Sequence, residues 1–125
     1  MATASRDGHL ALRRVERQQR LVELLYASGR RHTLAELGRD LGVSARTVAR
    51  DVERLRLAGA PIDVVPGRTG GVSLPRAGSP APIAFDLPEV AALVSSLTVL
   101  GPTATASAGS AMRKLTDALS PPPER

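Results

Sequence analysis

The sequence predicts a mainly α-helical fold with one small β-hairpin, in which two short helices meet at a sharp turn. Three observations predict it. Apolar residues recur at helical spacing on both sides of Gly42-Val43-Ser44. A Gly-rich turn over residues 66–71 separates two short β-type runs. The length of 125 residues leaves room for one small domain and an appendage.

The chain begins with small and polar residues, and we expect residues 1–13 to form a disordered basic arm. A first helix is predicted over residues 15–28 because apolar residues recur there on one face. Gly29 ends it, since glycine tolerates the left-handed backbone that follows a helix. The apolar face consists of Leu21, Val22, Leu24 and Leu25.

Two capped helices follow. Thr33 and Glu36 have the spacing of a capping box, in which each side chain bonds to the backbone N–H of the other. The helix that they open carries Leu34, Leu37 and Leu41 on one face and ends at Gly42. Ser44 is the N-cap of the next helix, predicted over residues 45–58. Its buried stripe consists of Val48, Val52 and Leu55, and Gly59 and Pro61 prevent its continuation.

A hairpin completes the first domain. Residues 62–65 form a short β-type run, residues 66–71 the turn and residues 72–74 the returning strand. The order helix, helix-turn-helix and hairpin is that of a winged helix, which we assign to residues 14–76.

The rest of the chain predicts a two-helix segment. Residues 77–85 read as a linker, 86–120 as two helices and 121–125 as a tail. The helix over 87–100 is apolar on more than one face, which implies packing on a partner. We expect a homodimer through this helix; packing against the first helix of the same chain is the alternative. The residues expected at the dimer interface are Leu93, Val94, Leu97 and Leu100.

Positive charge is concentrated in the first part of the chain. Residues 1–76 carry fourteen Arg and eight acids, whereas residues 77–125 carry three basic residues and four acids. A biased genomic base composition explains the excess of Arg over Lys, but not this asymmetry. The distribution is typical of a nucleic-acid-binding surface.

The helix over 45–58 is expected to enter the major groove of duplex DNA. Arg46 and Arg50 share a face; Arg46 is the candidate for base contact, and Arg50 for phosphate or for a pair with Asp51. Thr47 has the reach for a phosphate or a thymine methyl. Ser44 and the helix N-terminus suit a phosphate. These side chains could instead be an ordinary solvated face. The full set of expected DNA-binding residues is Ser44, Arg46, Thr47, Arg50, Arg54, Arg68 and Thr69.

Two further basic regions are open to more than one interpretation. Arg68 and Thr69 lie at the tip of the wing over 66–72, which we expect on the DNA backbone or in the minor groove. A solubilising hairpin tip is the alternative. Four arginines before and within the first helix either contact the DNA backbone or are simply solvated: Arg13, Arg14, Arg17 and Arg20.

Other function classes find little support. The chain has no Cys, so disulfides, Cys-based zinc sites and thiol catalysis are excluded. The two histidines, His9 and His32, have no partners at metal-ligand or catalytic spacing, and His32 is expected to be solvated or to cap a helix. We therefore expect no enzyme, cofactor or metal, no membrane segment, and a cytoplasmic, nucleoid-associated protein. The competing hypothesis is a winged-helix adaptor that binds proteins but not DNA.

The spaced residues of 42–62 and 66–74 resemble the winged helix of bacterial WYL-domain transcriptional regulators, often grouped with DeoR-type regulators. The pattern reads Gly-Val-Ser-x-Arg-Thr-Val-x-Arg-Asp-Val from Gly42, then Pro-Gly-Arg-x-Gly-Gly from Pro66. The resemblance implies transcription control and a dimer. Ala49, Val72 and Ser73 depart from the family's usual residues, which implies weaker wing contacts. No WYL domain follows before residue 125, so the chain is a short regulator or a truncated one, and ligand sensing is not carried over.

Overall fold

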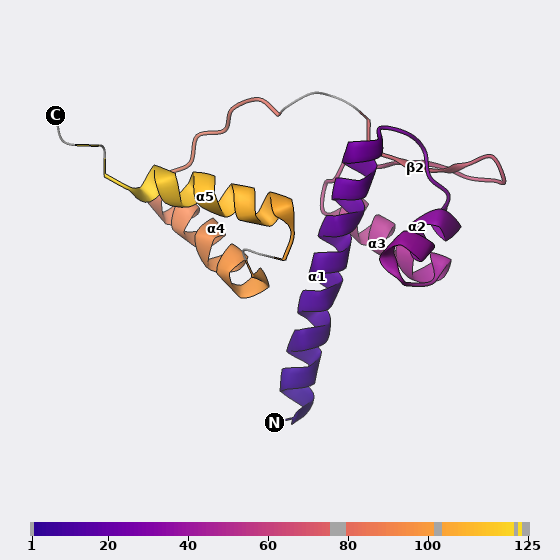
Figure 1. Ribbon diagram of the computed structural model, residues 1–125, viewed down its shortest axis with the longest axis horizontal. Helices are drawn as coiled ribbons and strands as arrows, with labels where there is room; N and C mark the ends of the chain where they lie inside the picture. The colour runs from indigo at the N-terminus through magenta and orange to yellow at the C-terminus, as the bar shows by residue number, and fades with distance from the viewer. Residues whose placement is uncertain (1, 76–79, 102–103, 122, 124–125) are drawn as a thin grey trace. The chain divides into compact units, whose positions relative to one another are not determined.

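The computed structural model describes residues 2–75, 80–101, 104–121 and 123, with side chains from residue 8 onward. The chain divides into two compact units, Met1–Ser79 and Pro80–Arg125. The described residues form five helices and one two-stranded antiparallel hairpin (Figure 1). The predicted mainly α-helical winged-helix architecture, followed by two helices, is confirmed.

The first unit has the predicted order of elements. Helix α1 spans Ala2–Ser28, α2 spans Leu34–Leu41 and α3 spans Ala45–Leu57. Strands β1 (Asp63–Val65) and β2 (Gly71–Ser73) pair in antiparallel register, with Val64 opposite Val72. The backbone of His32 adds an antiparallel bridge to Val72, so β2 is paired on both edges. Both backbone hydrogen bonds of this bridge measure 2.8 Å.

A single apolar core holds these elements together. Leu21 and Leu25 of α1 are fully buried, and the hydrophobic effect of burying such side chains drives the packing of α1 on the other two helices. Ile62 and Val72 extend the core under the hairpin, which anchors the wing to the helices. The buried cluster comprises Leu21, Leu25, Leu37, Val48, Val52, Ile62 and Val72.

The expectation of a disordered N-terminal arm is wrong for residues 2–13, because α1 begins at Ala2. Residues 10–14 are Leu-Ala-Leu-Arg-Arg, all strong helix formers. The C-terminal half of α1 is nucleated by its packing on the core, and each further turn then adds hydrogen bonds without a new nucleation cost. The helix therefore extends well beyond the part that the core requires.

Two helix starts have the sequence spacing of a capping box, but only one of them forms both hydrogen bonds of the box. Asp86 and Glu89 form a reciprocal capping box, with both hydrogen bonds at 2.9 Å. Thr33 Oγ1 accepts from the N–H of Glu36 at 3.1 Å. The Glu36 carboxylate, however, lies 3.5 Å from the His32 ring rather than completing the box. The local sequence thus specifies the helix start, while tertiary contacts decide where the Glu36 side chain goes.

The second unit is a helical pair. Helix α4 spans Leu87–Leu100 and α5 spans Ala106–Leu119, and the two pack against each other. Thr105 caps α5 by accepting from the N–H of Ala108 at 3.1 Å. Of the expected linker over 77–85, residues 77–79 lie outside the described residues, and residues 80–85 form neither helix nor strand. Of the expected tail, residues 121 and 123 are described, and neither is in a helix or strand.

A close backbone approach within the helix-turn-helix gives the first prediction. A Cβ atom added at buried Gly38 would lie 2.6 Å from the carbonyl oxygen of Val43, which is too close for any real contact. Gly38→Ala is therefore expected to lower the free energy of unfolding by about 1–3 kcal/mol. Gly8→Ala, at an exposed helical glycine with nothing within 4 Å, should instead stabilise by about 0.5–1 kcal/mol. Urea unfolding of both variants measures the sign; stabilisation by Gly38→Ala would contradict the close packing.

Candidate nucleic-acid interface

The start of α3 is fixed by one side chain. Ser44 Oγ accepts from the backbone N–H of Thr47 at 3.1 Å and lies 3.0 Å from the hydroxyl of Thr47. This N-cap satisfies one of the N–H groups that a helix leaves unpaired at its beginning. Gly42 precedes it with a φ of 72°, the left-handed conformation that ends α2. Two local constraints therefore define where α3 begins.

The buried stripe of α3 determines which residues face outward. Val48 and Val52 are in the core, and Leu55 packs against it. With about 100° of rotation per residue, Arg46 and Arg50 lie on the side opposite this stripe. Both arginines are exposed, and neither forms an ion pair with a carboxylate that the structure describes. They form the outward edge of α3.

Two predicted site residues lie on a flank of α3 rather than on that edge. Thr47 is half-buried, and its hydroxyl is engaged with Ser44. Arg54 has 49% side-chain exposure, but its Nη1 lies 3.9 Å from the buried carboxylate of Asp51. The positive charge of Arg54 is therefore partly balanced by the Asp51 carboxylate. The sequence places all of these residues on a common surface; in the structure Thr47 and Arg54 have side-chain partners there, whereas Arg46 and Arg50 have no ion-pair partner among the described acids.

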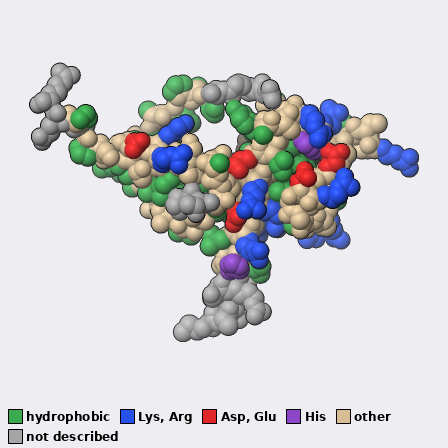
Figure 2. All heavy atoms as spheres, in the orientation of Figure 1, with side chains coloured by type: hydrophobic (Ala, Val, Ile, Leu, Met, Phe, Trp, Pro, Cys, Tyr) green, Lys and Arg blue, Asp and Glu red, His purple; other side chains and the backbone are tan. Residues whose placement is uncertain are grey.

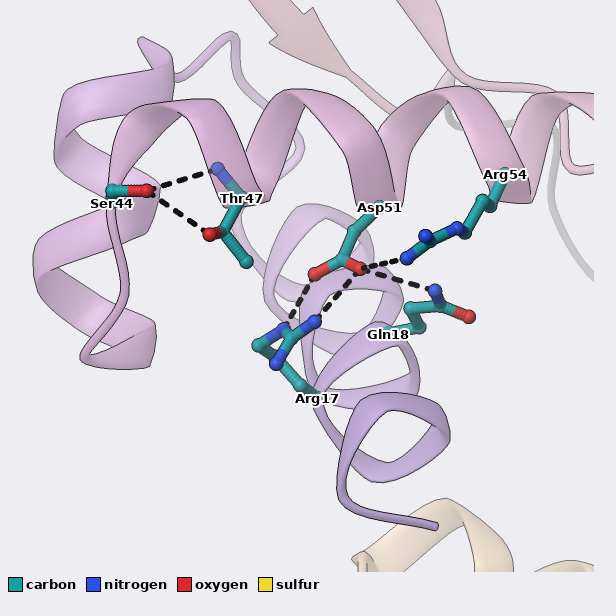
Figure 3. A network of polar contacts seen from close by, with 6 residues as sticks. All are labelled: Arg17, Gln18, Ser44, Thr47, Asp51 and Arg54. Carbon is teal, nitrogen blue, oxygen red and sulfur yellow. Dashed lines mark hydrogen bonds and ion pairs between the residues drawn. The ribbon is translucent and has the colours of Figure 1, made fainter. Parts of the chain in front are cut away.

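The buried carboxylate of Asp51 joins α3 to α1 (Figure 3). Arg17 donates from Nε to Oδ2 at 2.6 Å and from Nη2 to Oδ1 at 3.0 Å, and Gln18 donates to Oδ1 at 3.1 Å. Asp51 is 0% exposed, so these donors replace the water that the carboxylate has lost. The two-pronged geometry is available to Arg but not to Lys. The pair therefore fixes the rotation of α3 about its own axis.

Sequence analysis did not find this network. The sequence predicts that Arg17 contacts DNA or is solvated, and it offers Asp51 as a partner of Arg50. The hydrogen bond to Asp51 instead raises the pKa of the Arg17 guanidinium. A signal was present, because Asp51 falls beside the apolar stripe of α3, where a charged residue requires a buried partner. Nothing local identifies Arg17 as that partner, 34 residues earlier.

The wing depends on a close backbone approach. Gly71 has a φ of 147°, and a Cβ atom added there would clash with the carbonyl of His32. The turn between the strands holds Arg68 and Thr69, which are both exposed. Figure 2 shows a basic side chain at the end of the hairpin. The glycine-rich turn therefore carries an exposed cation on a hairpin that the core holds through Val72.

The expectation that His32 is solvated or caps a helix is wrong. Its side chain is 5% exposed, with Nε2 at 2.7 Å from the hydroxyl of Ser28. Nδ1 faces Glu36 at 3.5 Å, and Arg30 lies 3.7 Å from the same carboxylate. The backbone bridge to Val72 draws His32 into the sheet, which buries its ring. His32 therefore belongs to the framework of the wing.

A groove of about 470 Å³ lies between α3 and the hairpin. Ala49, Glu53 and Arg56 line its helical side, and residues 64–68 line the hairpin side. Residues 49, 53 and 56 form the flank of α3 opposite to Asp51 and Arg54. The outward edge with Arg46 and Arg50 thus lies between a flank that faces the wing and a flank that faces α1.

In the described part of the chain, no group of three or more His, Asp or Glu residues is arranged to hold a metal ion. Among the same residues, no helix combines the length and apolar character needed to cross a membrane.

Comparison with known proteins supports the same architecture. Residues 17–73 match the family model described as an HTH domain, a range that includes both Arg17 and Asp51 and ends with β2. The match supports a helix-turn-helix DNA-binding domain over these residues. No solved structure matches the chain significantly.

The Arg17–Asp51 pair gives the second prediction. Arg17→Ala leaves a buried carboxylate short of its main donor and is expected to cost about 3 kcal/mol of unfolding free energy. The double variant Arg17→Met/Asp51→Leu, which removes both charges, should stay within about 1 kcal/mol of the wild type. Arg20→Ala is the control, because its pair with Glu16 is more exposed and contributes less than about 1 kcal/mol. Equal losses for Arg17→Ala and Arg20→Ala in chemical denaturation would contradict the buried anchor.

Proposed function

We propose that the protein is a sequence-specific transcriptional regulator that inserts α3 into the major groove of duplex DNA. One observation carries the proposal: Arg46 and Arg50 stand together on the outward edge of a capped, core-anchored helix, with no carboxylate partner among the described residues. Arg reads guanine edges with two hydrogen bonds, and a helix with side chains fits the major groove.

The other predicted residues support this binding mode in different ways. Ser44 and Thr47 lie at the helix N-terminus, where hydroxyls and free N–H groups suit a phosphate. Arg54, whose side chain is 49% exposed beside Asp51, would contact a phosphate. Arg68 and Thr69 would lie on the backbone or in the minor groove. The resemblance to WYL-domain and DeoR-type regulators supports a bacterial regulator that acts in the cytoplasm, at the nucleoid.

The third prediction concerns the outward arginines. Arg46→Ala should weaken binding to the native duplex by about 1–3 kcal/mol, roughly 5- to 150-fold, and reduce the preference over a scrambled duplex. Fluorescence anisotropy with DNA from the gene's own upstream region, at several salt concentrations, measures both effects. Arg113→Ala is the control, because Arg113 is exposed in the second unit. Absence of wild-type binding at low salt would favour the protein-binding adaptor instead.

We also propose that the protein is a homodimer that uses α4. Between residues 90 and 100 the helix has no charged side chain. The hydroxyls of Ser95, Ser96 and Thr98 bond to carbonyls of their own helix at 2.8–2.9 Å. Such a helix is usually covered on most of its surface. A two-fold pair of α3 helices would then contact half-sites about one DNA turn apart.

The four residues expected at this interface differ in exposure. Val94, Leu97 and Leu100 are half-buried within the second unit, whereas Leu93 is 38% exposed. Val99 is 68% exposed and adds apolar surface beyond the four expected interface residues. The proposed interface is therefore centred on the exposed part of α4, with the half-buried residues beneath it.

The fourth prediction tests the dimer. Leu93→Glu introduces a charge into the proposed interface and should convert the protein to monomers at micromolar concentration, as measured by light scattering. The control is Lys114→Glu, which reverses a charge at an exposed position of α5 in the same unit and should leave the dimer intact. A wild-type protein that is monomeric under these conditions would refute the proposed assembly.

A further inference from the structure

A second basic surface lies beside the helix-turn-helix. A hollow of about 460 Å³ separates the middle of α1, residues 10–20, from the turn between α2 and α3. Three arginines of α1, at positions 13, 17 and 20, line it together with Glu16, and residues 41–43 form its other wall. The hollow lies entirely within the first unit, and the residue after its wall is the N-cap Ser44.

The three arginines differ in whether a carboxylate already pairs with their charge. Arg17 is committed to the buried carboxylate of Asp51. Arg20 pairs with Glu16 at 2.7 Å, but this pair is exposed enough to exchange partners. Arg13 is exposed and has no ion pair with any acid whose side chain the structure describes. Arg13 and Arg20 are seven residues apart, so both project from the same face of α1.

The position of this surface relative to α3 suggests its ligand. Asp51 and Arg54 lie on the flank of α3 that faces α1, whereas Ala49, Glu53 and Arg56 lie on the flank that faces the hairpin. A helix with its side chains, about 10–12 Å across, fills a major groove about 12 Å wide. The two sugar–phosphate backbones that border the groove therefore run along the two flanks of the inserted helix.

We propose that the α1 surface, centred on Arg13 with Arg20 beside it, binds the sugar–phosphate backbone on the flank of α3 opposite to the wing. Helix α1 and the hairpin then hold the two backbones that border the recognition helix. This proposal rests on DNA binding by α3. It assigns a role to the part of α1 that extends beyond the core, and it gives Arg17 a separate role in holding α3 at the required rotation.

The experiment compares neighbouring arginines in the full-length chain. Arg13→Ala should weaken binding to the native and the scrambled duplex by the same factor, roughly threefold to tenfold, and reduce the log–log salt slope by about 1 per subunit. Arg14→Ala is the matched control, because Arg14 is exposed on the same helix but does not line the hollow. Glu16→Gln removes the acid from the surface and should strengthen binding to both duplexes.

The outcomes separate this proposal from the proposed function. Equal behaviour of Arg13→Ala and Arg14→Ala, with Arg46→Ala still impaired, would overturn the α1 contact and leave recognition by α3 intact. If neither Arg46→Ala nor Arg13→Ala weakened the binding shown by the wild type, both the α3 and the α1 contacts would be overturned. Absence of binding by the wild type would overturn DNA binding itself. A decrease in affinity on Glu16→Gln would also count against the α1 contact, since it removes a negative charge from the surface.

Discussion

The buried pair between Arg17 and Asp51 is the constraint on which the candidate interface depends. Apolar packing alone tolerates small rotations of a helix, because apolar contacts have no fixed direction and core side chains can repack. A two-pronged bond to a fully buried carboxylate does not, since any rotation leaves a charge without water or a partner. Once Asp51 points at α1, Arg50 is turned about 100° away from it, toward solvent. The Arg17–Asp51 pair inside the protein therefore determines that Arg46 and Arg50 face outward.

The features that could be predicted from the sequence are those encoded within a few residues. Ser44 and Thr33 accept hydrogen bonds from N–H groups three residues later, as their spacing predicts. The core stripe of α3 and the order of helices and hairpin also follow from local periodicity. Features that join distant segments could not be predicted. The Arg17–Asp51 bond, the His32–Val72 bridge and the approach of Gly71 to His32 each join residues more than 30 positions apart.

The extent of α1 shows how a local interpretation can fail when cooperativity decides the outcome. Residues 2–13 contain small and polar residues and a glycine, a composition that is also typical of flexible arms. Helix formation is unfavourable mainly at nucleation, and the packed half of α1 supplies the nucleus through Leu21 and Leu25. Arg13, which a flexible arm would present without a fixed orientation, therefore lies on a defined face of a helix.

The number of arginines in the chain overstates the charge available to a DNA ligand. Several arginines already have carboxylate partners: Arg17, Arg20, Arg30, Arg54 and Arg56. Arg13, Arg46, Arg50 and Arg68 have none among the described acids, and all four are exposed. A paired arginine adds little net field, whereas an unpaired one releases counterions when it meets a phosphate. The strength of binding should therefore depend on these few unpaired side chains and their placement around α3, and much less on the overall basic composition.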